Sequence, residues 1–166
     1  MLISHVVTEG HPVLRQRALV DAVIGPDTDN LIKLMRDTIM YRQDAIAISA
    51  PQVSYSVPLF VTKCAEIPVV ISPKILQRDT EMETELEGCL SFPNVFVPIS
   101  RPKEIEVAFV DASGRPRSMF LTGIPARVFQ HEFDHLEGRL ISDYAENKKR
   151  VTVEARGLLL HRKETV

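Results

Sequence analysis

The sequence has 166 residues, of which 45% are hydrophobic and 25% charged, and its net charge is −2. These values are typical of one soluble globular domain, and they exclude a disordered chain and a basic nucleic-acid-binding surface. The apolar runs are too short for a transmembrane helix, and the first ten residues lack the apolar stretch of a signal peptide. Two cysteines are too few for a disulfide framework. We therefore predict a single intracellular domain over 1–166, without nucleic-acid or membrane partners.

Two helices are predicted in the first quarter of the chain. Pro12 suits the first turn of a short helix. A longer helix is expected to be capped by Asp27 or Thr28 and to end near Gln43. Between these limits, apolar side chains recur at helical spacing at Leu31, Leu34, Met35 and Ile39.

Short strands are predicted to follow this helix. Apolar runs separated by prolines indicate strands at 45–48, 57–61 and 69–71. A further strand is expected at 105–110. The turn-forming residues of 111–114 then lead into a return strand at 117–121, so that the two strands form a hairpin.

Helices are predicted again near the end of the chain. One runs over 125–136, and Gly138 is placed to stop it. The last stretch, 146–166, has helical composition and is expected to be a C-terminal helix interrupted at Gly157. Since helices and strands do not alternate regularly, we predict an α+β fold. In this fold, mostly antiparallel short strands surround a central metal-binding helix.

The metal-binding prediction rests on the run His131-Glu132-Phe133-Asp134-His135. Residues four apart on a helix share a face, so the imidazoles of His131 and His135 can bind one ion. Glu132 lies beside them and can move a proton to and from water. Apolar neighbours of the motif favour a buried helix over a solvated one.

A catalytic metal site usually has three protein ligands and one open position, so a third ligand is needed. The third histidine of a metzincin would fall at Ile141, which excludes that class. Glu154 is a candidate from a later helix, as in a metalloprotease of the gluzincin type. Cys89 is the other candidate, because its thiolate would bind a divalent metal strongly and the adjacent Gly88 permits close backbone approach.

Four segments together resemble the peptide deformylase family, type 1-like, over essentially the whole chain. Two match closely: Glu-Gly-Cys-Leu-Ser at 87–91 and Gln-His-Glu-Phe-Asp-His-Leu at 130–136. A third, Ala-Ile-Ala-Ile-Ser-Ala-Pro-Gln at 45–52, matches in part, and Gly-His-Pro-Val-Leu-Arg at 10–15 precedes it. The resemblance implies an enzyme that removes the formyl group from N-formylmethionyl nascent peptides, in the cytoplasm or an organelle, at or near the ribosome.

The resemblance also implies residue roles. One divalent metal ion, natively Fe²⁺ and replaceable by Zn²⁺, Ni²⁺ or Co²⁺, would be held by Cys89, His131 and His135. Glu132 would be the general base and acid. The remaining implied contacts are the oxyanion donors Gln52 and the Leu90 amide, the substrate contacts Ile46, Ala47 and Gly88, and the ion pair between Glu87 and Arg101.

The partly matched segment departs from the family pattern. Ala45 and Ala47 replace two glycines, and Ser49 stands where alanine is usual. In the family the second of these glycines lies beside the bound peptide, so a methyl group at Ala47 could narrow its approach. A non-catalytic relative that binds metal or formyl-peptide is therefore one alternative to a deformylase. A metalloprotease that uses Glu154 is the other.

Overall fold

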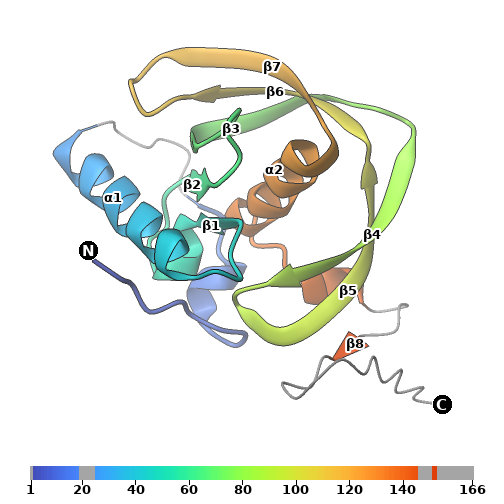
Figure 1. Ribbon diagram of the computed structural model, residues 1–166, viewed down its shortest axis with the longest axis horizontal. Helices are drawn as coiled ribbons and strands as arrows, with labels where there is room; N and C mark the ends of the chain where they lie inside the picture. The colour runs from blue at the N-terminus through green and yellow to red at the C-terminus, as the bar shows by residue number, and fades with distance from the viewer. Residues whose placement is uncertain (1, 19–24, 146–150, 153–166) are drawn as a thin grey trace.

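The computed structural model describes residues 2–18, 25–145 and 151–152, which form an α+β fold (Figure 1). The α-helices are α1 (Pro26–Tyr41) and α2 (Gly123–Leu136). Three short 3-10 helices are η1 (Pro12–Arg15), η2 (Ala50–Val53) and η3 (Ile141–Tyr144). The strands are β1 (Ala47–Ser49), β2 (Leu59–Thr62), β3 (Val69–Arg78), β4 (Met82–Cys89), β5 (Phe92–Pro102), β6 (Glu104–Val110), β7 (Pro116–Thr122) and β8 (Val151–Thr152).

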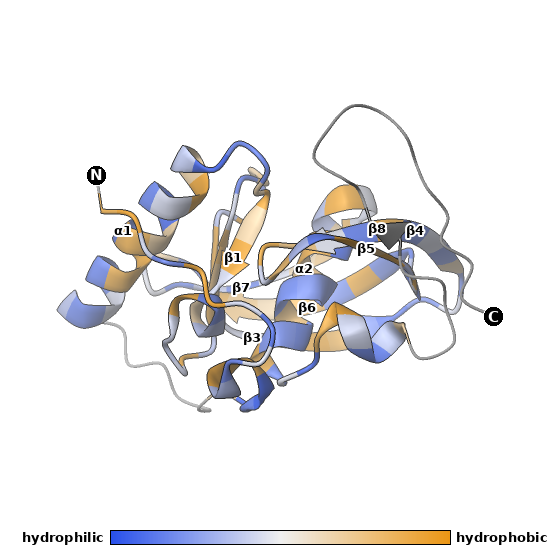
Figure 2. Cartoon of the chain, turned by 90° about the horizontal axis from the view of Figure 1, so that it is seen from below, coloured by the Kyte–Doolittle hydropathy of each residue, from blue (hydrophilic) through white to orange (hydrophobic). Residues whose placement is uncertain are grey.

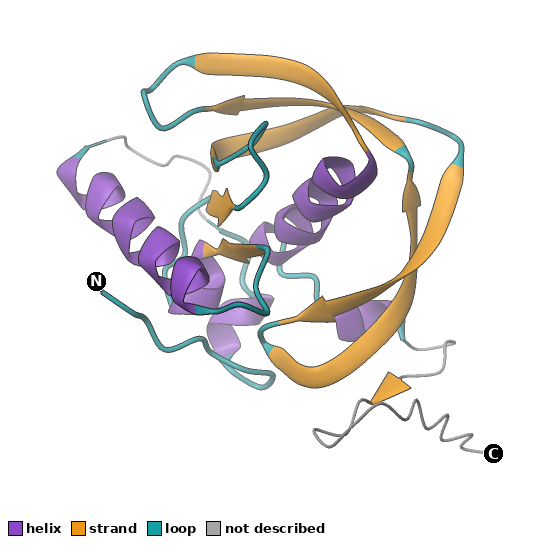
Figure 3. Cartoon of the chain, viewed as in Figure 1, coloured by secondary structure: helices purple, strands orange, loops and turns teal. Residues whose placement is uncertain are grey.

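These strands form two antiparallel sheets. The larger has the order β1-β2-β3-β6-β7, and the smaller has the order β4-β5-β8. Helix α2 lies between the larger sheet and the β4–β5 hairpin, whereas α1 lies outside, next to β1 and β2 (Figures 1 and 3). The predicted fold class, antiparallel strands around a central helix, is confirmed.

The larger sheet is covered on both faces because side chains alternate along each strand. In β2, Leu59 and Val61 join the cluster beneath α1, whereas Phe60 joins the cluster beneath α2. Phe129 of α2 is fully buried, and its ring meets that of Phe60 edge-on at 5.3 Å. Hydrophobic residues accordingly concentrate in the strands at the middle of the molecule, while α1 carries both hydrophobic and hydrophilic residues (Figure 2). This packing fixes α2 against the sheet.

The three helices predicted before Gly138 are present, with different ends. Helix α1 begins at Pro26, and its N-cap Gly25 makes no side-chain capping bond, so the predicted caps Asp27 and Thr28 are wrong. Both lie in the first turn, because proline with its fixed φ is well suited to the first helical position. Helix α2 begins at 123 rather than 125 and ends as expected before Gly138.

Gly138 ends α2 through its left-handed conformation, at φ 74°. Its N–H donates to the carbonyl of His135 at 3.2 Å, and the next N–H, of Arg139, donates to the carbonyl of Asp134 at 2.8 Å. These two bonds satisfy carbonyls that the last helical turn leaves open. The chain then turns away to pack near Arg15.

The strand predictions are confirmed with shifted bounds, and the 111–114 turn joins β6 and β7. The β4–β5 hairpin was not predicted. The residues of β4 are mostly polar and exposed, and β5 contains three prolines, so neither segment reads as a strand. Of the predicted C-terminal helix, 151–152 instead pair as β8 with β5, and the rest, with Gly157, lies outside the described residues.

Candidate metal centre

Three side chains from two elements converge beside α2. The Sγ of Cys89 and one ring nitrogen each of His131 and His135 all lie within 4.8 Å of one another. The Sγ is 3.2 Å from Nε2 of His135. Cys89 is the last residue of β4, and both histidines lie one turn apart on α2. The structure thus brings together the three predicted ligands.

The end of the β4–β5 hairpin directs Cys89 toward the helix. Gly88 pairs with Phe96, but the next residue, Cys89, pairs with Phe92, so the register shifts between them. Such an irregularity bends a strand and changes the direction of its side chains. A Cβ at Gly88 would lie 2.8 Å from the Phe96 ring, so this position favours glycine.

The charges in the cluster favour a metal-binding thiolate. Burial opposes ionisation of Cys89, but the charge of His135 and hydrogen bonds with both imidazoles lower its pKa well below the ordinary value. A thiolate and two imidazoles are a donor set for Zn²⁺ and for other divalent transition metals, and three ligands leave one position open. These residues therefore fit a catalytic metal ion.

Glu132 is placed beside this donor set. Its side chain is buried, and Oε2 has no hydrogen-bond partner among the described residues. Burial raises the pKa of its carboxyl, against the charges of His131 and His135. A buried carboxyl with a free oxygen next to a metal-binding cluster is suited to exchange a proton with water or substrate.

Gln52 reaches the same cluster from η2. Its side-chain amide donates to the Oγ of Ser91 at 3.2 Å and lies 3.5 Å from the Sγ of Cys89. Its carbonyl oxygen accepts from the N–H and the Oγ of Ser49, at 3.0 and 3.1 Å. Ser49, which replaces the usual alanine, therefore orients Gln52 toward the cysteine.

The other predicted contacts lie at two elements, the β4–β5 hairpin and β1. Leu90 follows Cys89 in the turn of the β4–β5 hairpin, and Gly88 precedes it and is exposed. Ala47 lies on β1, an edge strand, on the face opposite to the core residue Ile48, as does Ser49. Ile46 is 52% exposed just before β1.

Glu87 joins His131 to the rest of the protein. Its Oε2 lies 2.9 Å from Nδ1 of His131, and Arg101 donates to both of its oxygens, at 2.6 and 2.9 Å. Burial raises the pKa of Glu87, but the bonds with His131 and Arg101 prevail and lower it to about 2. The predicted pair of Glu87 and Arg101 is confirmed, and a carboxylate on Nδ1 leaves Nε2 of His131 available to a metal.

Sequence reasoning missed three members of this network. Arg101 also donates to Asp134 at 2.8 Å, and the hydroxyl of Tyr144 donates to the same oxygen at 2.7 Å. Arg127 donates to Glu87 at 2.7 Å. Asp134 lies inside the histidine motif, and Arg127 lies one turn before it, so helical spacing was the available signal. Their partners are remote in sequence and could not be inferred from it.

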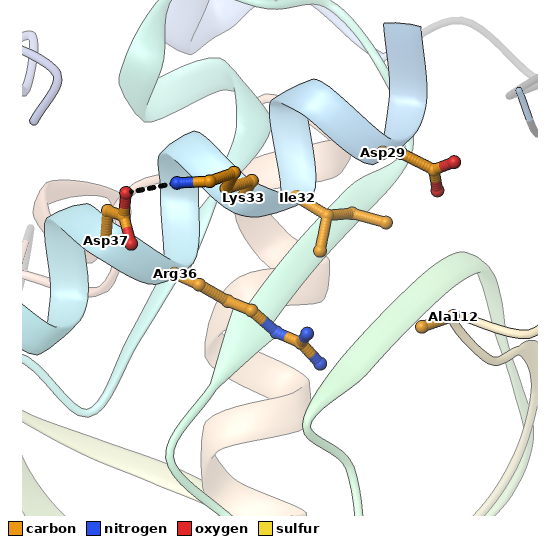
Figure 4. A pocket seen from close by; sticks show the side chains of 6 residues that line it. All are labelled: Asp29, Ile32, Lys33, Arg36, Asp37 and Ala112. Carbon is orange, nitrogen blue, oxygen red and sulfur yellow. Dashed lines mark hydrogen bonds and ion pairs between the residues drawn. The ribbon is translucent and has the colours of Figure 1, made fainter. Parts of the chain in front are cut away.

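Ile141 and Glu154 are the positions considered for other classes of metalloprotease. Ile141 is buried in η3, and Glu154 lies outside the described residues. A cavity of about 380 Å³ between α1 and the β6–β7 turn is lined by Asp29, Ile32, Lys33, Arg36, Asp37 and Ala112 (Figure 4). It shares no residue with the cysteine–histidine cluster.

The fold and the donor set define an α+β domain with a candidate cysteine–histidine–histidine metal site. The family model for polypeptide deformylase matches residues 3–151, and the chain belongs to this family. Its members are metalloenzymes that remove the N-formyl group from nascent peptides, so the chain is an enzyme of that kind.

Individual relatives agree with this assignment. The chain is 45% identical to the peptide deformylase of Thermotoga petrophila, over 86% of this chain and 87% of the relative. It is 38% identical to peptide deformylase 1B, chloroplastic/mitochondrial, of Arabidopsis thaliana, over 80% of this chain and 50% of the relative. The crystal structure of peptide deformylase from Thermotoga maritima aligns with a TM-score of 0.81 at 42% identity, covering 86% of this chain and 97% of that one.

One further finding concerns membranes. Within the described part of the chain, neither helix combines the length and the apolar character needed to span a bilayer.

Proposed function

We propose that the cysteine–histidine–histidine cluster is the catalytic centre for hydrolysis of the formamide of N-formylmethionyl peptides. The observation that carries this proposal is the convergence of Cys89, His131 and His135 within 4.8 Å, with the buried carboxyl of Glu132 beside them. The three side chains would hold one divalent ion, natively Fe²⁺, with Zn²⁺, Ni²⁺ or Co²⁺ able to replace it. The bound metal ion supplies Lewis acidity, which makes water nucleophilic near neutral pH.

The protein's own groups would then move the protons and orient the substrate. Glu132 takes a proton from the attacking water and delivers it to the amino nitrogen as formate leaves. Negative charge develops on the formyl oxygen during the attack. The side-chain amide of Gln52 and the backbone N–H of Leu90 are the donors for that charge, and loss of one such donor typically lowers the rate by about 10²–10³.

The substrate peptide would lie along the free edge of β1. In the described sheet β1 pairs only with β2, so its other edge is free; Ala47 lies on β1 and Ile46 directly precedes it. Gly88 would contact the peptide from the side of β4. We place the activity in the cytoplasm, acting on chains as they leave the ribosome; the plastid and mitochondrial name of one relative makes an organelle the other location.

Formate release from a formyl-methionyl peptide tests this function, with protein loaded with Fe²⁺. The assay is anaerobic because a ferrous thiolate site is open to oxidation. We expect turnover by the parent and almost none by Glu132→Gln, which keeps the shape of the side chain but cannot exchange the proton. The Gln variant should retain one metal ion per chain. Activity within a few-fold of the parent would assign the proton transfer to another group.

Cys89→Ala separates this proposal from a metalloprotease that uses Glu154. Only a deformylase site should lose its metal ion when the thiol is removed, which metal analysis after dialysis measures. A parent protein that binds metal and formyl-peptide but releases no formate would instead be the non-catalytic relative considered above.

A further inference from the structure

Arg127 joins both strands of the β4–β5 hairpin to the helix that carries both histidines. Its side chain is 13% exposed and lies on α2, one turn before His131. Nη1 donates to Oε1 of Glu87 at 2.7 Å and to the carbonyl of Ile99 at 3.1 Å. Nη2 donates to the carbonyl of Glu83 at 2.9 Å. These bonds reach β4 twice and β5 once.

The position of this side chain matters because the three candidate ligands come from different elements. Cys89 is on β4, and both histidines are on α2, so the geometry of the donor set depends on how the hairpin is held against the helix. Arg101 makes one connection, from β5 to Glu87 and to Asp134 of α2. Arg127 makes another, from α2 back to β4.

Both connections meet at one carboxylate. Oε1 of Glu87 accepts from Arg101 and from Arg127, while Oε2 accepts from Arg101 and faces Nδ1 of His131. The carboxylate is therefore held at both oxygens and cannot turn away from the imidazole without breaking several bonds. The planar fork of a guanidinium can contact two oxygens in fixed directions, which an ammonium group cannot do.

We propose that Arg127 is a positioning residue of the metal centre, which clamps the β4–β5 hairpin to α2 and fixes Glu87 against His131. Its hydrogen bonds and ion pairs go to residues other than the candidate ligands, so it acts through Glu87 and through the position of β4. This inference rests on the proposed function only in that Cys89, His131 and His135 are the metal ligands. Partners of metal-binding histidines typically alter metal affinity about 10–100-fold when they are removed.

The test measures Co²⁺ binding by the metal-free full chain, through the absorbance of a cobalt–thiolate site. Arg127→Met keeps much of the apolar stem and removes the fork. We expect Co²⁺ to bind about 10–100-fold more weakly, with a changed visible spectrum because Cys89 and the histidines are held less closely together. Arg127→Lys should recover part of the affinity, since it keeps the charge and some of the hydrogen bonds.

Two controls separate this role from a general loss of stability. Arg117→Met removes an arginine that pairs with Asp111 in the β6–β7 hairpin, outside the metal cluster. Glu85 is an exposed partner of Arg127, with its Oε2 2.9 Å from the Nε of the arginine. Glu85→Gln removes this charge and leaves in place the bonds of Arg127 to Glu87 and to the carbonyls of Glu83 and Ile99. Both variants should bind Co²⁺ within about twofold of the parent, on the small energies of exposed ion pairs.

The outcomes are distinguishable. Parent affinity and an unchanged cobalt spectrum in folded Arg127→Met would overturn the inference. If Arg127→Met does not fold, Arg127→Lys decides: binding at least threefold weaker than the parent with an altered spectrum supports the inference, and parent-like binding overturns it. A parent chain that binds Co²⁺ but releases no formate would refute the proposed function alone, because the Arg127 comparison depends only on metal binding.

Discussion

Replacing Gly138 by alanine should destabilise the end of the helix that carries the histidine motif. Gly138 has φ 74°, in the left-handed region that side chains rarely adopt. A Cβ built there lies 2.7 Å from the carbonyl oxygen of Arg15 and 2.9 Å from its carbonyl carbon. Both are backbone atoms and cannot rotate away as a side chain would. The N-terminal segment or the helix end must therefore shift.

Gly123 is the matched control, because it also has a positive φ, 58°, but a Cβ there meets nothing within 4 Å. Left-handed backbone costs alanine about 1–2 kcal/mol, partly offset by about 0.4–1 kcal/mol from the smaller entropy of the unfolded chain. Gly123→Ala should therefore cost about 1 kcal/mol. Overpacking adds about 1–3 kcal/mol at Gly138, which gives a total of about 3 kcal/mol for Gly138→Ala.

Thermal unfolding of the metal-free protein measures this difference without the added stability of a bound ion. At about 2–4 °C per kcal/mol, Gly138→Ala should lower Tm by about 6–12 °C and Gly123→Ala by about 2–4 °C. Equal shifts in the two variants would refute the contact with Arg15 as the source of the extra cost. A smaller shift at Gly138 than at Gly123 would refute the argument from conformation as well.

Three further predictions concern the site. Ala47→Gly should raise kcat/KM on a formyl-methionyl peptide about tenfold, or roughly 1.4 kcal/mol, with metal content unchanged; an equal or lower value would show that β1 already accommodates the methyl group. Ser49→Ala should lower kcat a few-fold in formate-release assays, because the side-chain oxygen of Gln52 then keeps only its bond from the backbone N–H of residue 49. An unchanged kcat would mean that this backbone bond alone orients the Gln52 amide. Gly88→Ala should lower the free energy of unfolding, measured with denaturant, by about 1–3 kcal/mol, because its Cβ would meet the Phe96 ring. Adding Phe96→Leu should recover part of this loss. If the costs of the two substitutions simply add, that contact is contradicted.

The departures from the family pattern have different positions in the structure. Ala45 is 3% exposed and belongs to the core cluster beneath α1. Ala47 and Ser49 lie on the opposite face of β1 from Ile48, and Ser49 bonds to Gln52 of the site. In one continuous strand residues 45, 47 and 49 would share a face, but β1 begins only at Ala47, so only the tertiary structure separates Ala45 from the other two positions.

Local patterns in the sequence determined the helix that carries His131 and His135, because residues four apart meet on one face whatever surrounds them. They also determined the β6–β7 hairpin through its turn, and the end of α2 through Gly138. Resemblance of short segments added Cys89 as a ligand. Each of these inferences depends on a few neighbouring residues, and so it could be made before the fold was known.

Only the tertiary structure decided how the two halves of the site are held together. Strand β4 is mostly polar and exposed, and three prolines interrupt β5, whose Val97 and Ile99 are buried against Leu140 and Ile141. The pairing of this hairpin therefore depends on contacts with distant segments. The bonds from Arg127 to Glu87 and from Glu87 to His131 join residues 40 and 44 positions apart. Such pairings arise because a buried carboxylate must find partners wherever the folded chain places them, and no local periodicity encodes that choice.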